Sequence, residues 1–289
     1  MIFHSYRQAL LVMLSLLLIP LDASYCTNDD IEQFYRTGYL LKKQAIAPST
    51  LQLLNTNSTL LLEKVLSALE DYPYQAEEQT ALLEGSHIVF LKRQGKPIAI
   101  QRIVGVCAIA PTLQKVLRSK KMLHTYFALL DTTCLEQLIC QFHPKLPGDG
   151  VSFNKHQDLE HRKYFDPNWQ DIGEKVSYAV CLLAIDPMTE ENGCLYIDPR
   201  SYQSQDKDPF PIIMEPGDLL FIHPQITHWS GENRSNISRR ALLTGYCIYG
   251  ANHENYPGNC TNDVFHKNSS LARPAPWKAG VPCVKRALR

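Results

Sequence analysis

The sequence has no excess of charge of either sign, because 29 Lys and Arg residues offset 29 Asp and Glu residues. A chain without net charge sets up no long-range field toward a polyanion, which excludes a general affinity for nucleic acid or anionic membranes. Internal repeats and low-complexity segments are also missing, which excludes solenoids and propellers. With 289 residues, 45% of them hydrophobic, the chain can bury a sizeable core. A small-molecule partner is therefore expected.

The sequence lacks an apolar run of the roughly 20 residues that a membrane-spanning helix needs. Its longest run, ALLVMLSLLLIPL at 9–21, follows a weakly basic start and precedes the small residues of DAS. This order predicts a secretory signal peptide over residues 1–24, although the usual cleavage spacing of small residues is missing. An uncleaved anchor, or a Met1 that is not the true start, is the alternative. Beyond this segment we expect no stable membrane partner.

The cysteines lack any CxxC or other zinc-binding spacing. Most lie in apolar sequence, where cysteine behaves as a small buried hydrophobe; these are Cys107, Cys134, Cys140, Cys181, Cys194 and Cys247. The three in polar, loop-like sequence are Cys26, Cys260 and Cys283. Sequons for N-glycosylation begin at Asn57, Asn233, Asn236, Asn259 and Asn268. Together these features favour a secreted protein or one of the secretory pathway, with the cytoplasm as the alternative.

The chain is helical at first and β-rich later. TNDDIEQFYRTGYLL predicts a helix capped by Thr27 or Asn28, ended by Gly38 and followed by a short strand. Leucines at helical spacing predict a second helix from Pro48 to Glu70, and PTLQKVLRS a third over 111–119. Short strand-like runs follow residue 120: MLHTYFALLD, CLEQLICQFH, KVSYAVCLLAI, GCLYID, PIIM, DLLFI and RRALLTGYCIY.

Many short strands after a few helices predict a mainly β protein, an antiparallel sandwich or barrel with flanking helices on one side. DPMTEENG at 186–193 and EPGD at 215–218 are predicted reversals between antiparallel strands. Residues 25–250 are thus expected to form a single domain, with a helical N-terminal part and a β core from about residue 120. Residues 251–289, rich in Pro, Asn and Lys, are expected to be a tail.

The stretch FNKHQDLEH places two metal-ligand residue types two positions apart. On a β-strand alternate side chains share a face, so His156 and Asp158 are expected to point the same way. FIHPQITHWS supplies a third ligand, His228, from a later strand. Two imidazoles and one carboxylate on one side of an ion are typical of a non-haem Fe(II) oxygenase. His161 and His223 are alternatives for the distal ligand.

Two arginines follow the distal histidine. HWSGENRSNISRRALLTGY leads from His228 through a polar loop to Arg239 and Arg240, at the start of an apolar strand. A guanidinium that turns inward needs an anion, and arginine holds a carboxylate through two parallel hydrogen bonds. No acidic residue in this run offers itself, so a co-substrate carboxylate is the expected partner. A surface pair on an edge strand is the alternative.

These motifs together resemble the phytanoyl-CoA dioxygenase family of Fe(II)- and 2-oxoglutarate-dependent oxygenases, over about residues 28–250. The resemblance rests on FYRTGYLL, HQD, EENGCLYIDP, EPGDLLFIHPQITHWSGEN and SRRALLTGY, in that order. It implies a double-stranded β-helix, the jelly-roll core of cupin-like proteins, with Fe(II) held by His156, Asp158 and His228. It also implies that Arg239, rather than Arg240, binds the far carboxylate of 2-oxoglutarate with help from Ser230.

The resemblance implies an activity as well. O2 and 2-oxoglutarate would be consumed, a small molecule would be hydroxylated, and succinate and CO2 would be released, with ascorbate as a further candidate cofactor. One alternative is a zinc hydrolase or lyase on the same barrel, with Glu160 or His161 as general base. That reading gives Arg239 no role. A non-catalytic binding protein is the other alternative, and the complete ligand set with its arginine argues against it.

Overall fold

The computed structural model describes residues 25–203, 206–256, 261–268 and 273–274; the expected signal peptide or anchor at 1–24 lies outside the described residues. The described helices are α2 (Asn28–Thr37), α3 (Pro48–Leu69), α4 (Val106–Ile109), α5 (Pro111–Leu117), α6 (Lys120–Leu129), α7 (Asp158–Phe165) and the 3-10 turn η1 (Pro199–Ser201). None of these helices has the length and apolar character needed to cross a membrane.

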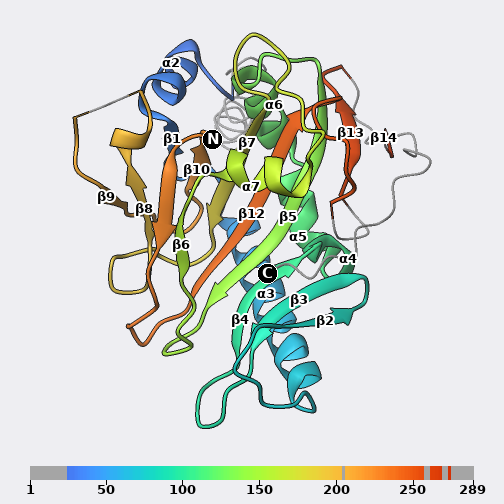
Figure 1. The fold of residues 1–289 in the computed structure, drawn as a ribbon, viewed down its shortest axis with the longest axis vertical. Coiled ribbons are helices and arrows are strands. Elements are labelled where there is room, and N and C mark those ends of the chain that lie inside the picture. Colours follow the sequence, from blue (N-terminus) through green and yellow to red (C-terminus); the bar gives the residue numbers. More distant parts are fainter. Residues whose placement is uncertain (1–24, 204–205, 257–260, 269–272, 275–289) are drawn as a thin grey trace, which may run out of the picture.

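Antiparallel strands form two sheets (Figure 1). The larger sheet, in spatial order, contains β1 (Tyr39–Lys42), β10 (Leu219–Ile222), β7 (Tyr178–Ala184), β12 (Arg239–Ile248), β5 (Cys134–Lys145), β4 (Ala99–Val104), β3 (Ser86–Leu91) and β2 (Gln79–Leu83). The smaller sheet contains β6 (Phe153–His156), β11 (Thr227–Ser230), β8 (Leu195–Asp198) and β9 (Phe210–Ile212). The two sheets form a jelly roll, so the predicted fold class is confirmed.

Both faces of the larger sheet are covered, and side-chain alternation divides the core in two. On β7, Cys181 and Leu183 pack into a cluster with the helices, whereas Leu182 and its neighbours in alternate positions pack toward the smaller sheet. On β10, Phe221 packs on the helical side and Ile222 on the other. A strand covered on both faces is apolar throughout rather than alternating, which is why KVSYAVCLLAI reads as a continuous hydrophobic run.

The N-terminal helices form where their sequence signals predict. The Thr27 hydroxyl accepts from the Asp30 amide, and the Asp30 carboxylate accepts from the Thr27 amide, so α2 begins with a capping box. Gly38 ends the helix at a φ of 82°, a left-handed conformation that favours glycine. The predicted helices over 48–70 and 111–119 are confirmed as α3 and α5.

One prediction about local structure is wrong. The run MLHTYFALLD is the helix α6 rather than a strand, with Ser119 as its side-chain cap. A short apolar run has no decisive period of its own, and helical packing on the larger sheet buries it equally well. The predicted turns at 186–193 and 215–218 connect strands of different sheets, β7 to β8 and β9 to β10.

The C-terminal part and one cysteine add connections that the sequence did not reveal. Strand β13 (Asp263–His266) pairs with β5 and with β14 (Arg273–Pro274), so part of the segment after residue 250 joins the larger sheet. Cys107 is buried, as expected, and is also disulfide-bonded, which the sequence did not indicate. Cys134, Cys140, Cys181 and Cys194 are free cysteines within the described ranges.

Candidate metal centre

Three ligand residues converge between the sheets. His156 at the end of β6 and His228 on β11 are direct partners in the antiparallel ladder, and their ring centroids lie 4.3 Å apart. The two carboxylate oxygens of Asp158 lie 3.8 Å from the Nε2 atoms of His156 and His228 respectively. One ligand atom from each residue lies within 4.8 Å of the others. This set can bind one ion from a single side and leave the opposite side open.

The route that brings Asp158 to the site differs from the prediction. Strand β6 ends at His156, and Asp158 is the first residue of α7, so strand alternation does not place it. The backbone turns at Gln157, and the Leu159 amide donates to the Pro224 carbonyl at 2.9 Å, which ties the start of α7 to the loop before β11. A helix N-terminus also favours a carboxylate, since its free amides carry partial positive charge.

Hydrogen bonds set the orientation of both imidazoles. Nδ1 of His156 donates to the Asn154 carbonyl at 2.7 Å, and Nδ1 of His228 donates to the Ile226 carbonyl at 3.1 Å. A carbonyl can only accept, so each Nδ1 carries a proton and each Nε2 keeps its lone pair for a metal. Burial lowers the pKa of His228, which keeps this ring neutral near pH 7.

The two alternative distal histidines lie elsewhere. His161 stacks on His156 with ring centroids 4.8 Å apart, but it is exposed and outside the ligand group. His223 is buried among aromatic rings, 5.5 Å from Phe34 and 4.6 Å from Tyr202 between centroids. Burial lowers the pKa of His223 to about 4, as expected for a neutral core histidine.

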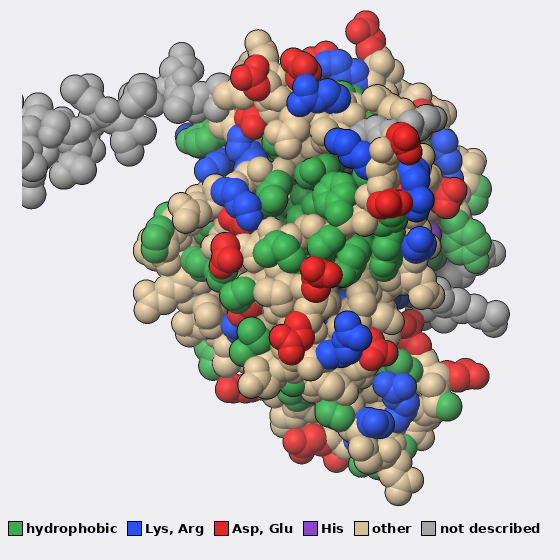
Figure 2. Space-filling view, turned by 90° about the vertical axis from the view of Figure 1, so that its left-hand side faces the viewer, with side chains coloured by type: hydrophobic (Ala, Val, Ile, Leu, Met, Phe, Trp, Pro, Cys, Tyr) green, Lys and Arg blue, Asp and Glu red, His purple; other side chains and the backbone are tan. Residues whose placement is uncertain are grey.

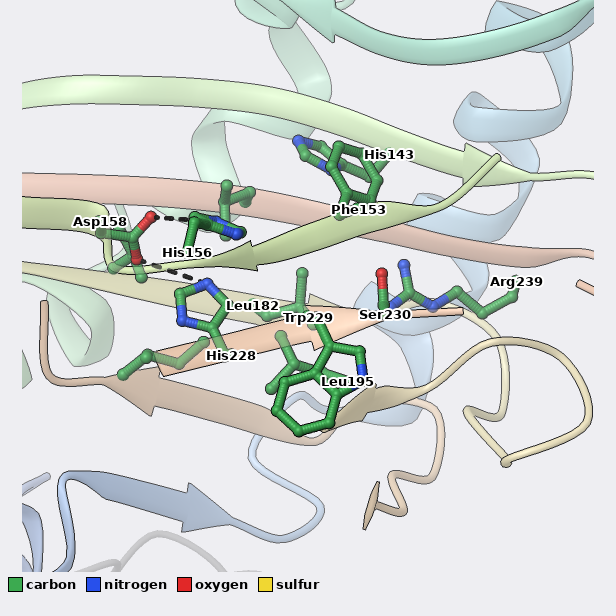
Figure 3. A pocket seen from close by; sticks show the side chains of 13 residues that line it. His143, Phe153, His156, Asp158, Leu182, Leu195, His228, Trp229, Ser230 and Arg239 are labelled. Atoms are coloured by element: carbon green, nitrogen blue, oxygen red, sulfur yellow. Dashed lines mark ion pairs between the residues drawn. The ribbon is translucent and has the colours of Figure 1, made fainter. Parts of the chain in front are cut away.

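A cavity extends from the ligand group along β11 to the predicted carboxylate-binding residues (Figure 3). Ser230 and Arg239 lie at one end, and His156, Asp158 and His228 lie at the other. The remaining lining residues are mostly apolar: His143, Phe153, Val180, Leu182, Leu195, Ile222, Trp229 and Leu243. The cavity thus has a metal-binding end, a cationic end and hydrophobic walls.

The adjacent arginines have different environments. Arg239 is only 3% exposed, its Nε has no hydrogen-bond partner, and it makes no ion pair within the described residues. Burial lowers its pKa to about 10, so the guanidinium stays charged near neutral pH. Arg240 instead forms two 2.7 Å bonds to the carboxylate of Asp186 and reaches Ser58 on α3. Only Arg239 is available to an anion in the cavity.

Sequence reasoning missed two polar residues at this site. His143 lines the cavity, stacks on Phe153 and hydrogen-bonds Gln141 at 2.8 Å through Nε2. Lys145, fully buried, bonds the Ser230 hydroxyl at 2.7 Å. The available signal was the alternation in QFHPK, residues 141–145: polar side chains at every second position of a buried strand all face inward.

Comparison with known sequences identifies a family and curated relatives. The model of the phytanoyl-CoA dioxygenase family matches residues 34–241. Methylphosphonate hydroxylase from Gimesia maris is 30% identical over 118 residues, covering 35% of this chain and 41% of that protein. 2-Aminoethylphosphonate dioxygenase from the uncultured bacterium HF130_AEPn_1 is 28% identical over 118 residues, covering 35% and 42%. The matched part thus spans about two-fifths of these relatives.

Solved structures share the fold at low sequence identity. EctD from S. alaskensis, with 2-oxoglutarate and 5-hydroxyectoine, has a TM-score of 0.63 at 14% identity, covering 88% of this chain and 87% of EctD. AviO1 from Streptomyces viridochromogenes Tue57 has a TM-score of 0.59 at 17% identity, covering 80% of this chain and 99% of AviO1. The likeness extends over most of both chains, so the jelly roll and its flanking helices are common to all three.

Proposed function

Because the chain belongs to the phytanoyl-CoA dioxygenase family, we propose that it is an Fe(II)- and 2-oxoglutarate-dependent dioxygenase that hydroxylates a small molecule. The main observation behind this proposal is that the cavity has two chemically distinct ends. Two imidazoles and one carboxylate meet at one end, and the buried guanidinium of Arg239, without an ion pair among the described residues, lies at the other.

Two buried polar atoms support the fit of metal and co-substrate. Oδ2 of Asp158 and Nε of Arg239 are both buried without a hydrogen-bond partner in the described part of the chain. Such atoms are unfavourable unless something else satisfies them. A divalent ion would satisfy the carboxylate oxygen, and a carboxylate would satisfy the guanidinium. The donor set of imidazole nitrogen and carboxylate oxygen suits ferrous iron.

Each protein group then has a defined task. His156, Asp158 and His228 would hold iron, which together with 2-oxoglutarate and O2 supplies the oxidising chemistry that yields succinate, CO2 and a hydroxylated product. Arg239 would bind the far carboxylate of 2-oxoglutarate through two parallel bonds, and the Ser230 hydroxyl would donate a third. Leu182, Leu243 and the other apolar walls would keep water away from the reacting atoms. Ascorbate remains a candidate accessory cofactor.

The zinc-hydrolase alternative fits the same ligands less well. A hydrolase needs a general base beside the metal, and the exposed positions of Glu160 and His161 provide no buried base. It also leaves the cationic end of the cavity without a purpose. Metal analysis of the purified protein separates the two: the dioxygenase retains and needs iron, and a hydrolase is active with zinc.

The substrate is proposed to be a small molecule. The two curated relatives reported above are named for reactions on phosphonates, which places such compounds first in a substrate screen. On the face shown in Figure 2, acidic and basic side chains are interspersed around hydrophobic ones rather than segregated. This face therefore offers no continuous basic track for a nucleic acid backbone, and the chain as a whole has no net charge.

A secretory location is proposed as well. A disulfide at Cys107 is typical of proteins that fold in an oxidising compartment. The sequon at Asn236 is exposed and accessible to glycosylation, whereas Asn233 is buried and donates to the carbonyls of Lys145 and Ile237. Expression in eukaryotic cells with glycosidase treatment tests this: a mobility shift abolished by Asn236→Gln supports it, and an unglycosylated intracellular product contradicts it.

Succinate release tests the activity. Iron-loaded protein should form succinate from 2-oxoglutarate only when O2 is supplied, and faster when the true substrate is present. Asp158→Ala is the matched control, because it removes one ligand at the start of α7 while the two histidines stay on their strands. Equal succinate formation by wild type and Asp158→Ala would contradict the proposal.

A further inference from the structure

Lys145 is a buried lysine at the cationic end of the cavity. It is the last residue of β5 and the direct ladder partner of Arg239 on β12. Its side chain is fully buried and forms no ion pair with a carboxylate among the residues that the structure describes, although Asp149 and Glu232 act on it at longer range. Burial and the nearby Arg239 lower the pKa of Lys145 to about 6. Two basic groups that form no ion pair with a carboxylate among the described residues are thus buried side by side, and a bound anion would favour the charged form of Lys145.

The contacts of Lys145 converge on one side chain of the cavity wall. Nζ donates to the Ser230 hydroxyl at 2.7 Å, to the Gly193 carbonyl at 3.4 Å and to the Gly231 carbonyl. Gly193 permits this arrangement, because a Cβ there would lie 2.5 Å from the Gly231 oxygen. The amine is therefore fixed between two strands by acceptors on three sides.

This contact determines what Ser230 can do. A carboxylate bound beside Arg239 favours the protonated form of Lys145, which has three protons and no lone pair, so that Nζ can only donate to the Ser230 oxygen. The Ser230 proton must therefore point away from Lys145. Ser230 lines the cavity beside Arg239 (Figure 3), so the proton is available to an acceptor bound there.

Resting on the proposed function, we propose that Lys145 is a positioning residue for co-substrate binding. It holds the Ser230 hydroxyl in the orientation that donates to the far carboxylate of 2-oxoglutarate, while Arg239 binds the same carboxylate directly. Its positive charge, when present, adds to the attraction for that anion. Lys145 thus acts through Ser230 and has no direct part in the oxidation.

The test is the affinity for 2-oxoglutarate, measured by calorimetry on the manganese-loaded full chain without O2. Lys145→Met should weaken binding by about tenfold or more, the usual effect of losing a charge-assisted hydrogen bond in a site. Ser230→Ala should weaken binding to a similar extent. The double variant should bind about as weakly as the weaker single variant, because both substitutions remove the same interaction. In turnover, Lys145→Met should raise KM for 2-oxoglutarate more than it lowers kcat.

Lys92 provides the matched control. It is also a buried lysine, and it donates to the carbonyls of Leu69, Glu70 and Tyr72 at the end of α3, far from the cavity in the chain and outside its lining. Lys92→Met should lower stability and leave 2-oxoglutarate affinity unchanged. An equal loss of affinity in Lys92→Met would show that Lys145 has only a structural effect.

The outcomes distinguish this inference from the proposed function. If wild-type protein binds 2-oxoglutarate and Lys145→Met binds it equally well, the role of Lys145 is wrong and the dioxygenase proposal stands. If wild-type protein fails to bind 2-oxoglutarate, both fail. If Lys145→Met does not fold, Ser230→Ala decides: unchanged affinity overturns the inference, since there would be no hydroxyl contact to position. The inference would also be overturned if the loss of 2-oxoglutarate affinity in the double variant equalled the product of the losses in the two single variants.

Discussion

His156 and His228 are direct partners across the β6–β11 ladder, and this pairing places two of the three proposed metal ligands on the smaller sheet. Each ring is held by a hydrogen bond to a carbonyl two residues earlier in the chain. The histidine side of the site is therefore preformed by backbone pairing, and only Asp158 depends on the start of a helix. Preformed ligands lose little conformational entropy when a metal binds.

Removing either imidazole should abolish stoichiometric iron binding. His228→Ala takes away one of three ligands, and the remaining pair cannot hold a divalent ion in competition with buffer. Metal content after dialysis, measured by mass spectrometry, checks this. His223→Phe is the control, because His223 lies only five positions away but outside the ligand group. Stoichiometric iron in His228→Ala would show that the ligand assignment is wrong.

Substitutions of the two neighbouring arginines should have different effects, one on 2-oxoglutarate binding and the other on the stability of the fold. Arg239→Ala should weaken 2-oxoglutarate binding by about thirtyfold or more, because a buried carboxylate loses its charged partner. Arg240→Ala should leave that affinity nearly unchanged but lower the free energy of unfolding by roughly 3 to 5 kcal/mol, because Asp186 keeps a buried charge without its partner. Calorimetry and urea denaturation measure the two effects. If Arg240→Ala weakened 2-oxoglutarate binding and Arg239→Ala mainly lowered stability, the roles assigned to the two arginines would be wrong.

His223 should make the fold sensitive to acid. Its pKa is about 4 in the folded protein and near 6.5 when the chain is unfolded, so the unfolded state binds more protons between these values. The stability contribution is complete above pH 6.5, falls as the pH drops and is lost by about pH 4. At about 1.4 kcal/mol per pKa unit, the loss is about 3 kcal/mol.

His223→Phe tests this directly, because phenylalanine keeps the contacts with Phe34 and Tyr202 without a titrating group. The urea midpoint of the variant should fall less than that of the wild type between pH 6.5 and 4.5. Parallel curves for the two proteins would mean that His223 does not titrate in this range.

The disulfide at Cys107 should be detectable and stabilising. In unfolded but unreduced protein, at least two of the nine cysteines should resist labelling by maleimide. Reduction should lower the free energy of unfolding by about 2 to 4 kcal/mol, the typical effect of one cross-link. Intact mass after labelling and urea denaturation with and without reductant check this. Complete labelling before reduction would exclude the bond.

Much of the fold was readable from the sequence because its signals are local. The capping residues of α2, the leucine spacing of α3 and the short strands bounded by Gly and Pro each act within a few residues. The ligand residues could be chosen because HQD and the later histidine form an ordered set. The helix α6 was misread, since a ten-residue apolar run packs equally well as strand or helix.

Other features depend on contacts between distant segments and could not be read locally. Asp158 reaches the site through the start of α7, which strand alternation does not anticipate. Asp186, which lies 54 positions before Arg240 in the sequence, binds its guanidinium and so keeps Arg240 from an anion in the cavity. The choice between the two arginines therefore needed either the structure or the family resemblance. Lys145 meets Ser230 only because β5, β12 and β11 come together in the jelly roll.

The most direct test of the account is an anaerobic titration of iron-loaded protein with 2-oxoglutarate, followed by visible absorption. A weak charge-transfer band should appear and saturate at one equivalent of 2-oxoglutarate per iron. It should be absent in His228→Ala and require more 2-oxoglutarate in Arg239→Ala. An iron-loaded wild-type protein that shows neither the band nor 2-oxoglutarate binding would contradict the central claim that the two ends of this cavity hold iron and its co-substrate.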